Sequence, residues 1–356
     1  MTAGIPAAPD AFNGVLIVDK PAGFTSFDVV AVLRGLTRQK KIGHTGTLDP
    51  MATGVLPLLL GTAAKAESLL PDTDKAYEAD FQLGVETDTQ DSTGAVLRES
   101  GSPASRGQVE SALERFQGEL MQLPPMYSAV RQNGRRLYEL AREGKVVERL
   151  PRPVVIREAK LLAYDAQSRR GRLFLVCSKG TYVRSVIADL GAALGTFGMM
   201  TGLRRTRACG FTLEDAQPLE RLRAEGAGYA AGCLLPVDRL FSRLPAVAVT
   251  GPQARRFCNG GGLSLERTAL AGSRQPGLRV RVYCSADSGA ADSGAADSGA
   301  VNSGAVNSGA VNSGAVNSGA VNSGPEPGNA FLGLGEVDAA GEQIGVCKLF
   351  RTAVPR

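Results

Sequence analysis

One segment carries most of the residues that could do chemistry: it runs Gly43-His44-Thr45-Gly46-Thr47-Leu48-Asp49-Pro50-Met51-Ala52-Thr53-Gly54. Its glycines allow the backbone to approach a ligand closely, and it holds the only histidine of the chain, His44, together with one carboxylate, Asp49. Such a loop could present a nucleophile. The alternative is structural, because an Asp directly before a Pro commonly starts a turn or a helix, in the helix with the carboxylate as the cap. On the residues alone, this structural role is favoured.

A second segment, Lys179-Gly180-Thr181-Tyr182-Val183-Arg184, is typical of a strand that ends, a glycine turn and a helix that begins. This turn presents Tyr182 and Arg184 side by side at the end of a sheet. An arginine beside a carboxylate keeps it ionised and orients it, as a nucleophilic Asp requires. A purely structural ion pair fits the spacing equally well. Tyr77, at the start of a predicted strand, is likewise either a packing residue or a reactive one.

Several classes of function lack their usual residues. The chain has a single histidine, and its six cysteines are spaced at least 24 residues apart, which leaves few ligands for zinc, iron or copper. Neither glycine-rich phosphate loop is present. We therefore expect no metal and no redox or nucleotide cofactor. The longest apolar run, Val55–Leu60, is too short to cross a membrane, and residues 1–12 lack a secretory pattern, so a cytoplasmic location with reduced thiols is expected.

Charge is unevenly distributed along the chain. Residues 131–172 contain ten Arg and two Lys against five acidic residues, whereas residues 72–99 contain eight acidic residues against two basic ones. Such separation makes one surface attractive to a polyanion. Two ordinary solvated faces explain the charges equally well.

The apolar pattern predicts an α+β fold. A length of 356 residues with 43% hydrophobic content suggests about two domains. Alternation predicts strands, and three- and four-residue spacing predicts helices, without a regular βαβ rhythm. The predicted strands are 14–18, 77–83 and 173–177, and the predicted helices are 26–36, 106–116, 137–143 and 181–194, the last with Arg184 off its apolar stripe.

The C-terminal part begins near residues 241–249 and predicts a small β-barrel. We expect a helix at 253–258 and strands at 278–284, 330–336 and 343–350. Between the first two strands lies the pentad segment, residues 286–325, with three A-D-S-G-A units, four V-N-S-G-A units and one V-N-S-G-P unit. Its small polar residues cannot offset the entropy of ordering. We predict a disordered, tolerated insertion at a hairpin tip.

Taken together, the motifs resemble those of the bacterial TruB-type tRNA pseudouridine synthases over residues 13–240. The matching segments are 14–21 (GVLIVDKP), 43–54, 74–77 (DKAY), 125–129 (PMYSA), 177–184 (CSKGTYVR) and 203–205 (LRR). Residues 331–336 (FLGLGE) are similar to the PUA-type RNA-binding domain of that family.

The resemblance implies a domain organisation. A flexible N-terminus, 1–12, precedes a catalytic domain, 13–243, built on a mixed, largely antiparallel sheet flanked by helices. That domain carries a basic RNA-clamping insertion at 127–149. A small PUA-like β-barrel follows at 244–356 and is interrupted by the pentad segment.

The resemblance also implies the reaction, which is isomerisation of the T-loop uridine at tRNA position 55 to pseudouridine without a cofactor. Asp49 would attack a flipped-out nucleotide, Tyr77 would stack on the base and help remove the C5 proton, and Arg184 would pair with Asp49. His44, Tyr182, Leu203 and Lys20 would line or brace the pocket. Phosphate contacts would come from Arg131, Arg135, Arg136 and Arg142.

The implied partner is the T arm of tRNA, bound by a monomer without an obligate protein partner and away from membranes. Two alternatives remain. The chain could act chiefly as an RNA-binding or RNA-folding protein, or it could belong to the related RNA-guided branch of archaea and eukaryotes.

Overall fold

The computed structural model describes residues 12–270, 272–285 and 329–351. The predicted flexible N-terminus, apart from residue 12, and the predicted disorder of the pentad segment lie outside these residues. The chain divides into two compact units, residues 1–240 and residues 241–356. Among the described residues, no helix combines the length and the apolar character needed to cross a membrane.

The first unit is built on a ten-stranded sheet whose main path has the order β14-β1-β3-β12-β4-β11-β10-β7, with β2 beside β3 and β13 beside β12. Only β1 with β14 and β3 with β12 pair in parallel. The strands are β1 (Gly14–Lys20), β2 (Ile42–His44), β3 (Thr53–Leu60), β4 (Lys75–Leu83), β7 (Gly118–Gln122), β10 (Arg152–Asp165), β11 (Arg170–Cys177), β12 (Gly198–Ala208), β13 (Phe211–Thr212) and β14 (Gln217–Pro218).

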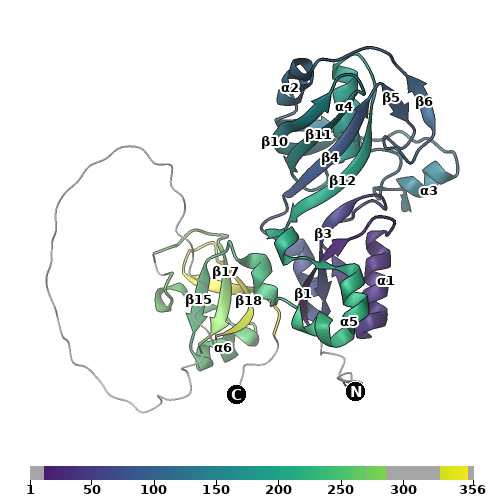
Figure 1. Cartoon of the computed structure of the whole chain (residues 1–356). Helices are drawn as coiled ribbons and strands as arrows, with labels where there is room; N and C mark the ends of the chain where they lie inside the picture. Colours follow the sequence, from purple (N-terminus) through teal and green to yellow (C-terminus); the bar gives the residue numbers. More distant parts are fainter. Residues whose placement is uncertain (1–11, 271, 286–328, 352–356) are drawn as a thin grey trace, which may run out of the picture. The chain divides into compact units, whose positions relative to one another are not determined.

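Helices cover this sheet in two groups (Figure 1). α2 (Arg106–Glu114) and α4 (Val183–Ala193) pack against β10, β4 and β12, whereas α1 (Ser26–Thr37) and α5 (Leu219–Gly232) pack beside β1. α1 starts with a capping box, in which Thr25 Oγ1 accepts from Asp28 N at 3.0 Å and Asp28 accepts in return from Thr25 N at 2.8 Å. Three short 3-10 helices complete the unit at Gly61–Leu69, Leu213–Asp215 and Val237–Phe241, the last ending at the boundary.

Two small hairpins lie beside the main sheet. One consists of β5 (Val85–Thr87) and β6 (Val96–Glu99), and the other consists of β8 (Arg131–Gln132) and β9 (Arg135–Arg136), which leads into α3 (Leu137–Arg142). The second hairpin and α3 fall inside the predicted insertion, 127–149.

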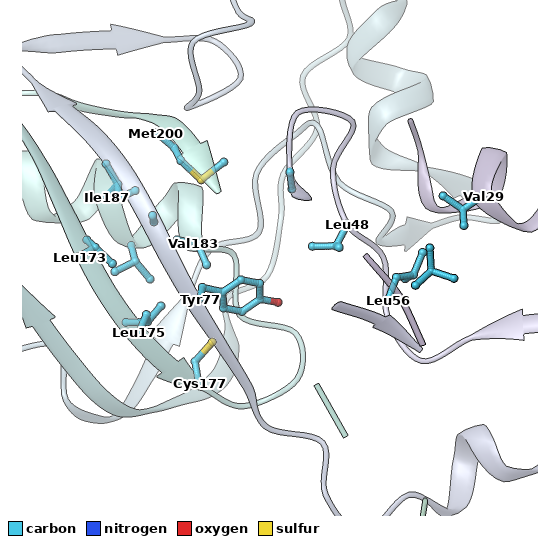
Figure 2. Packing of buried hydrophobic residues seen from close by; sticks show 14 of the residues in the cluster. Val29, Leu48, Leu56, Tyr77, Leu173, Leu175, Cys177, Val183, Ile187 and Met200 are labelled. Atoms are coloured by element: carbon cyan, nitrogen blue, oxygen red, sulfur yellow. The ribbon is translucent and has the colours of Figure 1, made fainter. Parts of the chain in front are cut away.

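The buried core of the first unit reaches the loop that joins β2 to β3. Figure 2 shows Leu48 of that loop facing the Tyr77 ring, with Cys177 and Val183 behind it. Gly54, at the start of β3, has φ +104°, and a Cβ there would lie 2.2 Å from the Arg205 carbonyl oxygen of β12. Only glycine permits this approach, so the last glycine of the motif lets β3 pair with β12 next to the loop.

The second unit is a curled five-stranded half-barrel of order β15-β17-β18-β19-β16. Its elements are β15 (Ala246–Val249), α6 (Gly251–Cys258), β16 (Leu263–Ser264), a 3-10 helix at Leu265–Arg267, β17 (Arg279–Cys284), β18 (Ala330–Val337) and β19 (Gln343–Leu349). β17 and β18 form an antiparallel pair in which Cys284 is in register with Ala330. The two strands therefore meet on either side of the pentad segment.

The predicted α+β class, with a mixed and largely antiparallel sheet flanked by helices and a small C-terminal β unit, is confirmed. The predicted strands and helices form within a few residues of the expected bounds. Four large elements were not predicted: β3, β10, β12 and α5. β10 and β12 carry many charged residues, which hides their alternation, and α5 contains three glycines, including Gly226 with φ +83° at an internal kink.

Candidate active site

Asp49 lies in the loop between β2 and β3, and its carboxylate faces Arg184 rather than a helix terminus. Asp49 Oδ2 is 3.0 Å from Arg184 Nε. Residues 49–52 form a turn, closed by a hydrogen bond from Ala52 N to Asp49 O at 3.0 Å, and the chain then enters β3. The turn that the residues alone favoured is therefore present, but the helix start that the same pattern allowed, with Asp49 as its cap, is wrong because a strand follows Pro50.

Arg184 is held rigidly in the first turn of α4, and only 4% of its side chain is exposed. Besides the Asp49 pair, Nη1 donates to Thr89 O at 2.8 Å and Nη2 donates to Tyr127 O at 2.9 Å. All three guanidinium nitrogens are thus engaged. Arg184 lies off the apolar stripe of α4, as expected, but it is buried because it points into this polar site.

Asp91 is a second carboxylate at the same arginine, and sequence analysis missed it. Its Oδ2 lies 3.6 Å from Arg184 Nη1. Its Oδ1 accepts from Thr89 Oγ1 at 2.8 Å, from Thr93 Oγ1 at 2.6 Å and from Thr93 N at 3.0 Å. The alternating Thr-x-Asp-x-Thr pattern was the available signal. The site therefore contains a carboxylate–guanidinium–carboxylate row.

Burial and charge act against each other at Asp49. About a third of its side chain, 36%, remains exposed. Burial raises the pKa of the Asp49 carboxyl, and the nearby Asp91 carboxylate raises it further, whereas the positive charges of Arg184 and Lys20 oppose this increase. Removing either cation therefore favours the protonated, unreactive form.

Lys20 ends β1, and its side chain is completely buried. Its ammonium donates to three main-chain oxygens. They are those of Phe24, of Pro21 at 2.9 Å and of Pro50 at 3.3 Å. Burial lowers the pKa of Lys20 to about 8, against the attraction of Asp49. Lys20 thus ties the residue after Asp49 to β1.

Tyr77 projects from β4 with 6% of its surface exposed. Burial raises the pKa of its hydroxyl to about 12, and the neighbouring Arg205 guanidinium opposes the increase. Arg205 itself is fully buried, and donates to Val55 O at 2.7 Å, Thr47 O at 3.4 Å and Gly46 O at 3.2 Å. Arg205 therefore connects the loop between β2 and β3 to β3 itself. Tyr77 is a neutral phenol at neutral pH.

The remaining predicted pocket residues have separate positions. His44 is the last residue of β2. Burial lowers the pKa of its imidazole, and the nearby Arg205 guanidinium lowers it further. Its buried Nδ1 has no hydrogen-bond partner among the described residues. Tyr182 precedes α4, where Gln122 accepts from its N–H at 2.8 Å and donates to its carbonyl at 3.1 Å. Leu203 lies partly buried on β12, next to the core. The lowered pKa of His44 leaves its imidazole uncharged at neutral pH.

The four predicted phosphate-binding arginines differ in their surroundings. Arg135 forms an ion pair with Glu143, which also pairs with Lys145 at 3.0 Å. Arg136 donates to Tyr138 Oη at 3.0 Å. Arg142 lies over the Tyr138 ring with its guanidinium carbon 5.3 Å from the centroid, and Arg131 is exposed on β8. The charge of Arg135 is thus largely neutralised within the insertion.

Possible metal ligands are dispersed in the described parts of the chain. They contain no group of three or more His, Cys, Asp or Glu side chains arranged to hold a metal ion, and all six cysteines are free thiols.

The chain matches family models over most of its first unit. Residues 34–183 match the TruB family pseudouridylate synthase N-terminal domain, and residues 184–242 match the tRNA pseudouridylate synthase B C-terminal domain. Residues 286–325 match eight copies of a pentapeptide repeat.

Individual relatives agree with this assignment. The chain is 45% identical to the tRNA pseudouridine synthase B of Aromatoleum aromaticum over 271 residues, covering 76% of this chain and 85% of that protein. It is 44% identical to that of Ralstonia pickettii over 278 residues, covering 78% and 86%. A solved Cbf5-Nop10-Gar1 complex has a similar fold, with a TM-score of 0.64 at 21% identity over 98% of this chain and 90% of the matched chain. The chain therefore belongs to the TruB family of pseudouridylate synthases, which are isomerases.

Proposed function

We propose that this protein isomerises the T-loop uridine at position 55 of tRNA to pseudouridine, with Asp49 as the nucleophile. The observation that carries the proposal is the Asp49–Arg184 pair at 3.0 Å, in a loop whose sequence matches the family. The uridine must leave its folded loop before a carboxylate can reach it. We further propose that the enzyme acts in the cytoplasm as a monomer on free tRNA.

The proposed reaction exchanges one bond for another. Asp49 attacks the target nucleoside and forms a bond to it, the bond between C1′ and N1 breaks, and the base rotates while bound. C1′ then bonds to C5, and the bond to Asp49 breaks and releases the free carboxylate. N1 gains a proton and C5 loses one, so no oxidant, reductant or nucleotide is consumed. Tyr77 stacks on the base and takes part in removing the C5 proton, while His44, Tyr182 and Leu203 surround the nucleotide.

The direct test is incubation of purified protein with an unmodified tRNA transcript, without added metal or nucleotide, followed by mapping of pseudouridine at single-nucleotide resolution. We expect product at the T-loop uridine alone. A folded protein that binds tRNA but yields no product contradicts the proposal and favours an RNA-folding role or a guide-dependent enzyme.

We also propose that residues 13–243 form the catalytic domain, with the 127–149 insertion as a clamp on the T arm, and that residues 244–356 form a PUA-like RNA-binding domain. Arg131 and Arg142 are exposed, whereas Arg135 has Glu143 beside it. Phosphate contacts supply affinity through the release of counterions, so the first two should contribute more.

Replacing both Arg131 and Arg142 with Gln should weaken tRNA binding and flatten its salt dependence. Loss of two phosphate contacts reduces the slope of log K against log salt by roughly 1.4–1.8. Titrations of tRNA at several salt concentrations measure this slope. Arg172→Gln, whose arginine pairs with Asp80 at 2.6 Å on the sheet, is the control and should leave it unchanged. If the double variant has the same salt slope as Arg172→Gln, the RNA phosphates do not contact Arg131 and Arg142.

The pentad segment is proposed to be dispensable. Cys284 and Ala330 are in register, so deleting residues 286–328 leaves Ser285 and Asn329 as a two-residue turn, a common hairpin length. We expect pseudouridine formation within about twofold of the full chain and a melting temperature within a few degrees, because loop length changes closure entropy only slowly. Calorimetry and the tRNA assay measure both, and a large loss of either assigns the repeats a binding or structural role.

A further inference from the structure

Lys75 is a cation in the site to which neither the motifs nor the proposed reaction gives a role. It is the first residue of β4, in register with Cys177 of β11 and Ala208 of β12. Alternate residues of a strand share a face, so Lys75 lies on the same face as Tyr77. Its ammonium reaches the catalytic loop, because a Cβ built on Gly46 would lie 2.9 Å from Lys75 Nζ.

The charge of this ammonium is not neutralised by the protein. In the described parts of the chain Lys75 makes no ion pair, and Asp74, its neighbour, pairs instead with Arg157 at 3.1 Å. Burial lowers the pKa of Lys75, Arg205 and Lys179 lower it further, and only the Cys209 and Cys177 thiols oppose them. Lys75 is only partly exposed, so the free enzyme holds an ammonium beside Arg205 and Lys179 with no acidic partner among the described residues.

Such an arrangement is costly unless an anion arrives. A buried charge is normally paired, because desolvation disfavours the charged form. Arg205 is less available to an anion, since each of its three nitrogens already donates to a carbonyl, of Val55, Thr47 or Gly46. Lys75 has no such partners among the described residues, and its ammonium can bind a phosphate as a point charge.

We propose that Lys75 binds a phosphodiester oxygen of the substrate RNA immediately next to the target uridine. The proposal rests on the proposed function and assigns a further binding residue to the same site. Two residues along a strand span about 6.6 Å, so Tyr77 and Lys75 can hold one nucleotide by its base and by its phosphate. The cation then gains its missing partner only when the nucleotide has left the T loop.

The test pairs lysine variants with neutral backbone linkages. T-arm stem-loop RNAs carry one methylphosphonate on either the 5′ or the 3′ side of the target uridine. With wild-type enzyme, one of the two linkages should lower kcat/KM by about tenfold, the effect of losing one charge-assisted hydrogen bond. On unmodified RNA, Lys75→Gln should lower kcat/KM by about the same factor. On the RNA with that neutral linkage, the variant should show no further decrease in kcat/KM. Lys75→Arg should recover part of the activity.

Two further measurements separate binding from a structural role. Without RNA, Lys75→Gln should raise the melting temperature, because an unpaired and partly buried cation is removed from beside Arg205. In the Asp49→Asn background it should reduce the salt slope of tRNA binding by about 0.7–0.9, as for one phosphate. The control is Lys160→Gln, an exposed lysine of β10 paired with Glu158, which should change neither the melting temperature nor the linkage effects by much.

Several outcomes would overturn the proposal. If the losses in kcat/KM from Lys75→Gln and from the neutral linkage are additive at both positions, Lys75 does not contact either phosphate. If Lys75→Gln lowers the melting temperature and reduces kcat/KM equally on every substrate, the lysine has a structural role. If inorganic phosphate inhibits wild type but not Lys75→Gln while the linkage effects stay additive, the site binds free anions instead. If wild type forms no pseudouridine on unmodified RNA, the proposed function itself has failed.

Discussion

Asp49→Asn is expected to abolish pseudouridine formation, with a loss of about 10⁴-fold or more in the single-turnover rate, while tRNA affinity stays within a few-fold. Asparagine fills the same space beside Arg184 but lacks the anionic oxygen that would attack. Removal of a nucleophile that works within a group typically costs this much or more. The substitution changes one side chain, whose carboxylate faces Arg184 Nε at 3.0 Å. The proposed phosphate contacts of the RNA come from other residues and should remain in place.

The measurement combines single-turnover conversion of a tRNA transcript with binding of the same transcript. Asp80→Asn is a matched control, since Asp80 also pairs with an arginine, Arg172 at 2.6 Å, but lies exposed. It should retain activity, because exposed ion pairs contribute at most about 1 kcal/mol. Retained isomerisation in Asp49→Asn would remove Asp49 from the nucleophile role. Equal loss of binding and rate would indicate that the loop, rather than the reaction, has been disrupted.

Arg184→Gln is expected to lower kcat by about 10²–10³-fold and to move the acid limb of the pH–rate profile toward higher pH. Loss of one preorganised electrostatic contact has this magnitude. The direction follows from Asp49, whose pKa is raised by burial and Asp91 while Arg184 opposes them. Without the guanidinium the pKa rises further, so a larger fraction of the carboxyl is protonated at any given pH. The rate should therefore continue to increase with pH where the wild-type rate is already constant.

Arg184 is 4% exposed and pairs with two carboxylates, so its removal should also destabilise the fold by about 3–5 kcal/mol. Arg184→Lys keeps the charge and separates the two effects. It should restore much of the acid limb while leaving kcat low, because an ammonium cannot reach Asp49, Thr89 O and Tyr127 O together. An Arg184→Gln enzyme with an unshifted profile would show that Arg184 does not control the ionisation of Asp49.

The predictable parts of the molecule are those encoded in short-range patterns. Alternation from Tyr77 to Leu83 and three- and four-residue spacing in 183–190 required only burial of one face, and both elements formed. The Asp49–Pro50 pair forms the expected turn but starts no helix, since a local capping preference was considered without its surroundings. The following run is buried on both faces, between β1 and β12, and that tertiary context determines a strand even with Pro57 inside it.

Asp91 and Lys75 show what a sequence pattern cannot express. Each occurs within the 72–99 stretch, whose charges fit a solvated face, yet the structure buries Asp91 and leaves Lys75 only partly exposed. The position of Asp91 depends on Thr89, Thr93 and an arginine from a distant helix. The Thr-x-Asp-x-Thr pattern indicates the local hydrogen bonds, but the approach of Arg184 is fixed by packing across the sheet, and no local spacing encodes it.

The register of Cys284 with Ala330 has a consequence for how the second unit folds. A hairpin usually closes through neighbours in sequence, whereas here the first paired residues are separated by the whole pentad segment. Pairing β17 with β18 is thus a non-local event, of the kind that slows folding far more than it changes equilibrium stability. The repeats therefore slow the folding of the second unit more than they change its final stability.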